Sequence, residues 1–419
     1  MAKPTRVLIL TQYFPPETGA PQARLFEMAK RLVARGYDVE VLTAMPNYPQ
    51  GKIYNGYRGK WHVVEEIEGM RVIHSPIFPS RSARLVPRLA SYFSFVVSSI
   101  LWGLCLVRRP DVLICESPPL FLGLSAIFLK TVFRCPLIFN VSDLWPESAV
   151  RMGLHNKKFL VTLAVWLERF CYRSAAAVTC QSHGIVRGVR SKSQGKRVEL
   201  LPNGCDCERF KPAHRSATLR EKYGVEDKLV VGYAGLLGVA QGIGAIVEVA
   251  ERLRFDSRIQ FLIVGDGPER EYIEKELQLR RLPNVKFTGW LGRDEMPAMV
   301  ASFDIGFVPL KYYIPGALPS KIYETMASET PVLLASQGGD PEELLCRANA
   351  GVSVDYDAPD EVAGAIARLA DSAEERMRLG RNGRRYVLTH HQREIISERL
   401  AVLIDDVTGS VASKTQQAA

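Results

Sequence analysis

The chain has 419 residues, 47% hydrophobic and 24% charged, a composition typical of a globular protein with room for two large domains. Residues 1–212 carry 29 Lys and Arg against 15 Asp and Glu, whereas residues 213–419 carry 25 against 30, which together give the net charge of +9. A basic half favours an anionic partner: nucleic acid, an anionic membrane or a phosphorylated ligand. Nucleic acid is disfavoured, because the sequence shows no zinc-finger, basic-helix or RNA-recognition pattern.

Eight cysteines are scattered along the chain, and only Cys205 and Cys207 lie close together. Their spacing is too short for a zinc knuckle, and no set of histidines and cysteines lies nearby to complete a metal site. The pattern therefore predicts free thiols in a reducing cytoplasm and no metal. The sequence starts with a strand pattern and shows no signal-peptide pattern.

Strand and helix patterns alternate in both halves of the chain. In the first half we predict strands at residues 6–14, 37–44, 70–76, 111–117, 136–142, 176–182 and 197–202, with a helix at 23–36 and a long loop at 46–60. In the second half we predict strands at 228–235, 259–267, 285–290, 305–310, 331–336 and 351–355, with a helix at 320–328. This alternation predicts two α/β domains with Rossmann-like, doubly wound parallel sheets facing each other across a cleft.

The domain boundary is placed by a change of pattern near residues 205–215. We predict an N-terminal, acceptor-binding domain at 1–205 and a C-terminal, nucleotide-binding domain at 206–389. A helix at 390–409 could pack back on the first domain, and the polar tail 410–419 is expected to be disordered.

An uncharged run at residues 89–107 follows three arginines and is followed by two more. It is long enough to span a membrane, but four serines dilute it and the α/β pattern continues on both sides. A helix at the bilayer interface, an ordinary buried helix and a span all remain open. We prefer the interfacial helix, with Phe93, Phe95 and Trp102 as inserted side chains.

Glycine-rich or polar turns follow several of the predicted strands. They lie at residues 15–20, 235–242 and 265–269, and a further turn, 318–321, opens the helix at 320–328. Glycines let backbone amides approach a phosphate, and a helix start adds positive potential. Each turn alone could be an ordinary tight turn, but ligands bind at the carboxyl ends of parallel strands, where all of these turns lie.

Four polar residues near strand ends have both a structural and a functional interpretation. Lys321 and Glu324 lie in the first turns of the helix at 320–328, with Ser320 as its expected N-cap, so they could hold an anion or belong to an ordinary surface helix. Asp143 could reach a ligand or cap a helix. Asn203, before Gly204, could contact a ligand or shape a hinge turn.

These motifs together resemble those of retaining glycosyltransferases of family 4, which have the GT-B fold. The resemblance covers nearly the whole chain, through PPETG, PNGCD with a following Phe, VGDGPE, VKFTGWL and the segment that ends in PV at residue 332. Segments such as VSDLWPES, SPPLF and PSKIYE are most similar to bacterial N-acetyl-L-fucosamine transferase-like enzymes of surface polysaccharide synthesis.

The resemblance implies a role for each matched position. Glu324 would bind the donor ribose, Lys321 and Ser320 the diphosphate, and Leu291 with its neighbours the nucleobase. Asp143, Lys321 and Glu324 would be the catalytic residues. The expected donor-binding residues are Gly19, Ala20, Asn203, Gly235, Leu236, Gln241, Gly242, Gly265, Asp266, Gly267, Leu291, Leu318, Pro319, Ser320, Lys321 and Glu324.

The sequence also departs from the family pattern. The first glutamate of the family's paired glutamates falls on Gly316, and the family's phosphate-binding Arg and Lys fall on Leu236 and Gln241. The usual His before Asp143 is Ser142. A departing diphosphate still needs compensating charge, and Lys321 is the expected substitute.

The resemblance implies a metal-independent retaining hexosyltransferase that needs no cofactor besides its nucleotide-sugar substrate. The expected donor is a UDP-sugar, with N-acetyl-L-fucosamine or another N-acetylated hexosamine. The expected acceptor is a lipid-diphosphate-linked saccharide of O-antigen, lipopolysaccharide or capsule synthesis, at the cytoplasmic face of the plasma membrane. A sugar-nucleotide 2-epimerase of the same fold and a catalytically silent membrane scaffold are the alternatives.

Overall fold

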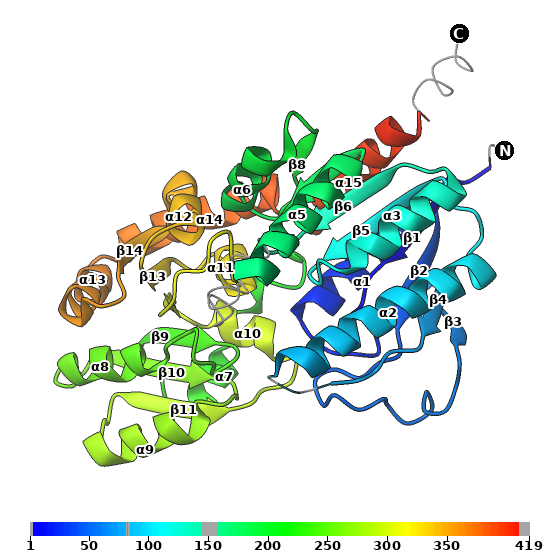
Figure 1. Cartoon of the computed structure of the whole chain (residues 1–419). Coiled ribbons are helices and arrows are strands. Elements are labelled where there is room, and N and C mark those ends of the chain that lie inside the picture. The colour runs from blue at the N-terminus through cyan, green and yellow to red at the C-terminus, as the bar shows by residue number, and fades with distance from the viewer. Residues whose placement is uncertain (1–2, 81, 83, 145–157, 410–419) are drawn as a thin grey trace, which may run out of the picture. The chain divides into compact units, whose positions relative to one another are not determined.

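The computed structural model describes residues 3–80, 82, 84–144 and 158–409, and it divides into two compact units (Figure 1). The first unit comprises residues 1–202 together with 396–419, and the second comprises residues 203–395. The predicted boundary after residue 205 and the structural boundary after Pro202 differ by three residues. The C-terminal helix α15 (Arg393–Thr408) begins in the second unit, and its residues from Ile396 onward belong to the first.

The first unit contains an eight-stranded sheet in the order β3-β4-β2-β1-β5-β6-β7-β8. All neighbouring strands are parallel except β3, which is antiparallel to β4. The strands are β1 (Arg6–Leu10), β2 (Asp38–Ala44), β3 (Val63–Ile67), β4 (Met70–Ser75), β5 (Val112–Ser117), β6 (Leu137–Val141), β7 (Ala177–Cys180) and β8 (Val198–Leu200).

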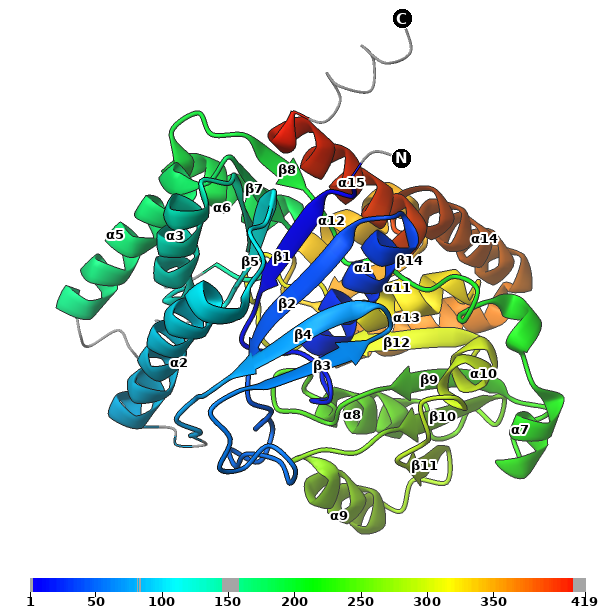
Figure 2. The same cartoon turned by 90° about the vertical axis from the view of Figure 1, so that its right-hand side faces the viewer.

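Helices cover both faces of this sheet, because alternate side chains of the strands supply two separate cores. Val7 and Ile9 of β1 belong to a core shared with α1 (Ala20–Ala34) and α15. Leu8 and Leu10 belong to a core on the other face. The helices of that face are α2 (Leu85–Leu106), α3 (Leu122–Phe133), α5 (Lys158–Ser174) and α6 (His183–Ser193), and Figure 2 shows α2, α3 and α5 on the opposite side of the sheet from α1.

Strand β3 was not predicted from the sequence. It is a short edge strand with alternating half-buried and exposed residues, and two of its five residues are glutamates. A two-residue turn, Glu68-Gly69, joins it to β4, and both turn residues have positive φ (50° and 75°). This backbone conformation suits a tight hairpin. The strand was missed because glutamate is uncommon in strands.

The second unit contains a six-stranded, wholly parallel sheet in the order β11-β10-β9-β12-β13-β14. Its strands are β9 (Leu229–Ala234), β10 (Ile259–Val264), β11 (Val285–Gly289), β12 (Ile305–Pro309), β13 (Val332–Ser336) and β14 (Gly351–Asp355). Its helices are α7 (Ala217–Lys222), α8 (Gly244–Arg252), α9 (Arg270–Arg280), α10 (Met296–Ala301), α11 (Ser320–Ala327), α12 (Asp340–Ala348), α13 (Pro359–Asp371) and α14 (Ala373–His390), with a short 3₁₀ turn at Pro212–His214.

The strand order places a topological switch point in each sheet. In the second sheet, the chain proceeds from β9 outward to β10 and β11, then returns to β12 on the other side of β9. The first sheet does the same between β1 and β5. Parallel α/β sheets bind ligands at the carboxyl ends of the strands beside such a point.

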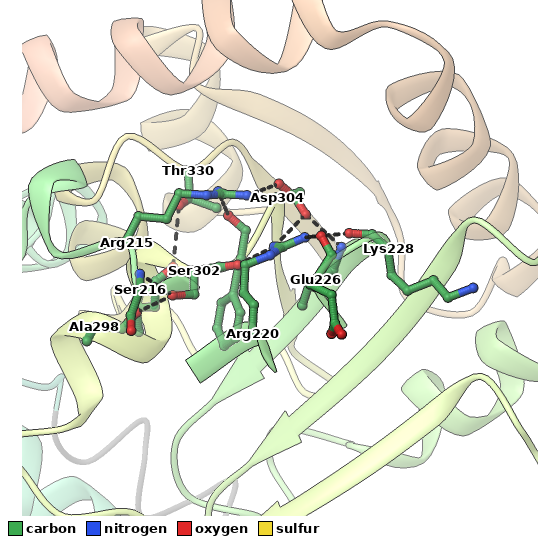
Figure 3. A network of polar contacts seen from close by, with 12 residues as sticks. Arg215, Ser216, Arg220, Glu226, Lys228, Ala298, Ser302, Asp304 and Thr330 are labelled. Atoms are coloured by element: carbon green, nitrogen blue, oxygen red, sulfur yellow. Dashed lines mark hydrogen bonds and ion pairs between the residues drawn. The ribbon is translucent and has the colours of Figure 1, made fainter. Parts of the chain in front are cut away.

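A network of ion pairs fastens the amino ends of β9 and β12 (Figure 3). The Asp304 carboxylate accepts hydrogen bonds from Arg215 (2.7 Å), Arg220 (3.0 Å) and the Val230 amide (2.8 Å). Burial would raise the pKa of Asp304, but the Val230 amide and the two arginines outweigh it and lower the pKa. This cluster lies at the edge of the sheet opposite to the ends of the strands that bind ligands, so its role is structural.

Helix α2 packs against β2 and β4 and lies beside α3. Its serines face inward: Ser98 donates to the Pro76 carbonyl (2.5 Å), and the hydroxyls of Ser99 and Ser125 are 2.8 Å apart. The prediction that Phe95 inserts into a membrane is wrong, because Phe95 is fully buried in the core. Phe95 lies on the same side of α2 as the buried Ser98 and Ser99, which are three and four residues further along the helix.

Phe93 and Trp102, the other two residues predicted to insert, are not fully buried. The Phe93 ring lies 4.8 Å from that of Phe121, and the Trp102 ring lies 4.6 Å from that of His62. By length and composition, Val86–Leu106 is the one helix among the described residues that could cross a membrane.

Candidate active site

The carboxyl edge of the second sheet brings the predicted glycine turns together. Gly235 follows β9 with φ 140°, and Gly265 follows β10 with φ 147°. A Cβ on Gly265 would lie 1.8 Å from the Gly235 carbonyl oxygen, so the two turns pack too closely for any side chain. The amide of Leu237 donates to the Asp266 carbonyl (2.9 Å), and that of Glu269 donates to the Leu237 carbonyl (3.0 Å). Residues 265–269 therefore act as a support for the first turn.

Two backbone amides in the turn after β9 are not used within the turn. Within the described residues, the N–H groups of Leu236 and Gly238 have no hydrogen-bond acceptor. Leu236 is 60% exposed, whereas Gly238 is buried. Gln241 and Gly242, by contrast, donate their amides to the Gly238 carbonyl and close the turn before α8. Of the two residues only Leu236 is exposed, so its amide is the candidate for binding a phosphate oxygen at this strand end.

Helix α11 opens at the same edge, after β12. Its N-cap is Pro319 and Ser320 is its first residue, so the predicted N-cap at Ser320 is wrong by one position. The Ser320 hydroxyl donates to the Glu324 carboxylate one turn further on. Leu318 and Pro319 form the partly buried approach to the helix, and the side chain of Ser320 is exposed.

Lys321 reaches from this helix to the glycine turn. Its ammonium donates to the Tyr233 hydroxyl (2.6 Å) and lies 3.9 Å from the centre of the Tyr233 ring. The Tyr233 hydroxyl in turn donates to the Leu236 carbonyl (2.6 Å). A Cβ on Gly235 would lie 3.2 Å from the lysine nitrogen, so the absence of a side chain there gives Lys321 its room.

Burial shifts the pKa values of Lys321 and Glu324 in opposite directions. Burial lowers the pKa of Lys321 to about 7, although Glu324 opposes the shift. Burial raises the pKa of Glu324, with Lys321, Arg393, Ser320 and Arg209 acting in the opposite direction. Desolvated cations bind anions more strongly than hydrated ones, because less water has to be displaced.

Lys321, Glu324 and Gly235 also line a small cavity with apolar walls from β9, β12 and α10. Its volume is about 70 Å³, far below the several hundred Å³ that a nucleotide fills. A nucleotide at this edge would therefore lie over the cavity and present its phosphates to the turn and to α11.

Several residues at this edge were missed from the sequence. Arg209 and Arg393 act on the Glu324 carboxylate, although they lie far from it in the chain. Lys311 follows β12 at the switch point, is exposed, and donates its amide to Ala240 in the glycine turn (3.1 Å). Only Lys311 had a signal in the sequence, namely its position directly after a predicted strand.

Two of the predicted donor-binding residues, Leu291 and Asn203, lie in packed surroundings. The Leu291 side chain is 8% exposed and packs in the core, which leaves its backbone for a nucleobase. Its neighbour Trp290 is 70% exposed. Asn203 begins the second unit, and Gly204 packs against Arg393, since a Cβ there would lie 2.8 Å from the arginine Cγ.

The first unit carries a second polar cluster at the carboxyl edge of its sheet. Arg24 forms an ion pair with Glu116 (2.5 Å) and donates to the Ser142 hydroxyl (2.8 Å). Ser142 also hydrogen-bonds Glu116 and Gln181. Asn140 donates to the other oxygen of Glu116 (2.5 Å). Ser142, where the family pattern has a histidine, is thus held in a partly buried network, and Asp143 follows it directly.

The N-cap alternative for Asp143 involves residues 145–157, which lie outside the described residues. Gly19 is the N-cap of α1 with ordinary extended backbone, and Ala20 begins that helix. The preceding Glu17 accepts hydrogen bonds from the amides of Asn47 (2.6 Å) and Tyr48 (2.8 Å), which fixes the loop before α1. The proposed approach of Gly19 to the donor phosphates stays a prediction.

Both halves of the chain match known protein families. Residues 19–204 match the glycosyl transferase 4-like domain, and residues 216–386 match glycosyl transferases group 1. WcaI of Escherichia coli K12, named for colanic acid biosynthesis, is 27% identical over 87% of this chain and 91% of its own. A GDP-mannose-dependent alpha-mannosyltransferase of Mycolicibacterium smegmatis is 25% identical over 91% of this chain and 92% of its own.

Among solved structures, Anabaena Alr3699/HepE in complex with UDP superimposes with a TM-score of 0.72 at 17% identity, covering 96% of this chain and all of that one. This likeness supports the architecture of two parallel-sheet α/β units. Since the two family models match residues 19–204 and 216–386 and the chain forms two parallel-sheet α/β units, the chain is a glycosyltransferase of the GT-B fold and belongs to family 4.

Proposed function

We propose that this protein transfers a hexosyl group, with retention of configuration, from a nucleoside diphosphate sugar to a lipid-diphosphate-linked saccharide. The single observation that best supports a donor site is the position of Lys321. This partly buried cation lies at the start of a helix, and Tyr233 holds it against a glycine turn at the switch point of the sheet. Such a cation, with the helix end and the amide of the exposed Leu236, suits the diphosphate of a nucleotide.

In the proposed reaction, the bond between the sugar C1 and the β-phosphate oxygen breaks, and a bond forms between C1 and an acceptor hydroxyl oxygen on the same face of the sugar. The acceptor's proton passes to the departing phosphate, and a nucleoside diphosphate leaves. Lys321, with Arg209 and Arg393 nearby, would stabilise the charge on the leaving group. Glu324 would accept hydrogen bonds from the ribose hydroxyls, and Asp143 would orient a sugar.

These cations and the helix end supply the charge that a divalent metal would otherwise provide, so we propose a metal-independent reaction without a further cofactor. An acceptor on a lipid places the enzyme at the cytoplasmic face of the plasma membrane, as the basic first half of the chain suggests. The E. coli relative named for colanic acid biosynthesis supports a pathway of surface polysaccharide synthesis, and O-antigen, lipopolysaccharide and capsule are the candidates.

For the donor we propose a UDP-sugar, with N-acetyl-L-fucosamine or a related N-acetylated hexosamine as the sugar. The likeness to a structure that contains UDP supports this choice. A GDP-sugar is the second candidate, because the mycobacterial relative is named for its dependence on GDP-mannose. Trp290 and the backbone of Leu291 would contact the base in either case.

Thermal-shift titration with UDP, GDP, ADP and dTDP tests the donor site. We expect stabilisation by UDP in the native protein, and its loss in Lys321→Met but not in the control Lys275→Met, which changes an exposed lysine of α9. Stabilisation by GDP alone would favour the second candidate. Equal stabilisation of native protein and Lys321→Met would contradict the site.

A further inference from the structure

The outer sides of three neighbouring helices of the first unit carry an unusual number of large apolar side chains. On α5, the exposed ones recur at spacings of four, three and four residues: Phe159, Leu163, Trp166 and Phe170. Helices α2 and α3 present further ones: Phe93, Val97, Leu101, Leu104, Phe128 and Val132. Helix α3 packs against both α2 and α5, and Figures 1 and 2 show the three helices side by side.

Helix α5 is apolar on two sides. Its inner side buries Leu167, Cys171 and Tyr172 in the core of the unit. Its outer side holds the four exposed residues, of which Trp166 and Phe170 stack with their ring centres 5.4 Å apart and their planes within 5°. A surface helix of a soluble protein is ordinarily polar on its outer side. A continuous apolar surface across several helices marks an interaction site.

The exposed charged side chains of these three helices are basic. Within the described parts of α2, α3 and α5 the only carboxylate is Glu168, which is buried and paired with Lys192 (2.7 Å). Exposed arginines lie next to these helices at Arg84, Arg109 and Arg134, and on α5 at Arg169 and Arg173. An apolar surface whose helices carry exposed arginines and no exposed acid complements an anionic lipid bilayer, where side chains meet hydrocarbon and arginines meet phosphate.

We propose that the outer sides of α2, α3 and α5 together form one docking surface that lies in the headgroup–acyl boundary of an anionic membrane. The inward serines of α2 and its packing against β2 and β4 keep this helix on the sheet, so it inserts sideways and does not cross. The surface thus extends beyond α2, and α5 supplies the second group of inserted aromatic side chains. This inference rests on one part of the proposed function, namely that the lipid-linked acceptor lies in a membrane.

Co-sedimentation with vesicles tests this surface. The native protein should bind vesicles of phosphatidylcholine with phosphatidylglycerol, bind vesicles of phosphatidylcholine alone much less, and dissociate as salt is raised. Replacing three side chains of α5 (Phe159→Ser, Trp166→Ser and Phe170→Ser) should lower the partition coefficient at least about tenfold with α2 unchanged, because three inserted rings are lost. A variant of α2, Phe93→Ser with Val97→Ser and Leu101→Ser, should lower it similarly.

The matched control changes two exposed apolar residues of the second unit, Phe255→Ser and Leu279→Ser, and should bind vesicles as the native protein does. Thermal shift with UDP and GDP, run on every variant, separates this inference from the proposed function, since nucleotide binding by the second unit should persist. Native-like vesicle binding by the α5 variant, or a native protein that ignores vesicles, would overturn the inference. So would a dimer in solution, seen by light scattering, that both helix variants dissociate.

Discussion

Replacing Lys321 with methionine should remove a pH dependence from nucleotide binding. Burial lowers the pKa of Lys321 to about 7, so above that pH the free protein holds mostly the neutral amine. A diphosphate beside the nitrogen favours the ammonium, so binding must take up a proton. The affinity should therefore fall as the pH rises above about 7.

The size of the effect follows from the pKa. Each pH unit above the folded pKa costs about 1.4 kcal/mol for recharging the amine, which is a factor of about 10 in the dissociation constant. Lys321 is partly accessible, so solvent screening reduces the cost, and we expect a loss of about 10-fold to 100-fold between about pH 7 and pH 9. The terminal phosphate of the nucleotide titrates near pH 6, so its protonation does not account for a change of affinity between about pH 7 and pH 9.

Isothermal titration calorimetry with the nucleoside diphosphate, repeated in buffers of different ionisation enthalpy, measures both the affinity and the proton uptake. The native protein should take up close to one proton per nucleotide above pH about 7, whereas Lys321→Met should bind weakly at every pH and take up none. A pH-independent affinity with no proton uptake in the native protein would refute the placement of Lys321 at the diphosphate.

Four further substitutions test other parts of the site and the fold. Glu324→Ala should weaken nucleotide binding by about 1.5–3 kcal/mol in calorimetry, because a charged hydrogen-bond acceptor is lost. Asp143→Asn should leave donor binding intact and lower the rate of sugar transfer, measured by product formation. Tyr233→Phe should lower the transfer rate and change its pH profile in a folded protein, because the Lys321 ammonium loses its hydrogen-bond partner. Asp304→Asn should lower the free energy of unfolding by about 3–5 kcal/mol in denaturant titrations, since two arginines lose their partner. Because the pKa of Asp304 is depressed, its stabilisation of the native protein is present above about pH 4 and is lost at lower pH. The variant should lack this acid dependence.

The alternation of apolar strands with helices was sufficient to predict both sheets, because parallel strands buried on two faces read as short apolar runs. The start of α11 was predicted within one residue, since proline excludes the preceding residue from a helix. Edge strand β3 was missed because edge strands bury little and tolerate glutamate.

The orientation of α2 was predicted only in part. Counting apolar residues identified the helix, but Phe95 was expected to face outward and faces the core. The serines were taken to weaken the apolar surface, whereas Ser98 and Ser99 form hydrogen bonds inside the fold. Which side of an apolar helix faces the sheet depends on partners elsewhere in the chain, so composition alone could not decide it.

The partners within the candidate site could not be read from the sequence at all. Tyr233 and Lys321 are 88 residues apart in the chain, and Arg24 and Glu116 are 92 apart. Each pair meets because different strands end at the same edge of a sheet. The sequence indicated which turns lie at that edge, and the structure shows which side chains meet there.

The most direct test of the proposed function is a transfer assay with purified native protein and Lys321→Met. Labelled UDP- and GDP-sugars would be incubated with lipid-diphosphate-linked saccharides, and the products analysed by mass spectrometry, with the anomeric configuration read by NMR. The native protein should release a nucleoside diphosphate and extend the lipid-linked acceptor by one sugar with retention, and Lys321→Met should be slower by about 10²–10³-fold, the effect of losing one charge-stabilising group. Equal rates for the two proteins, or an epimerised sugar nucleotide with no extended acceptor, would contradict the account.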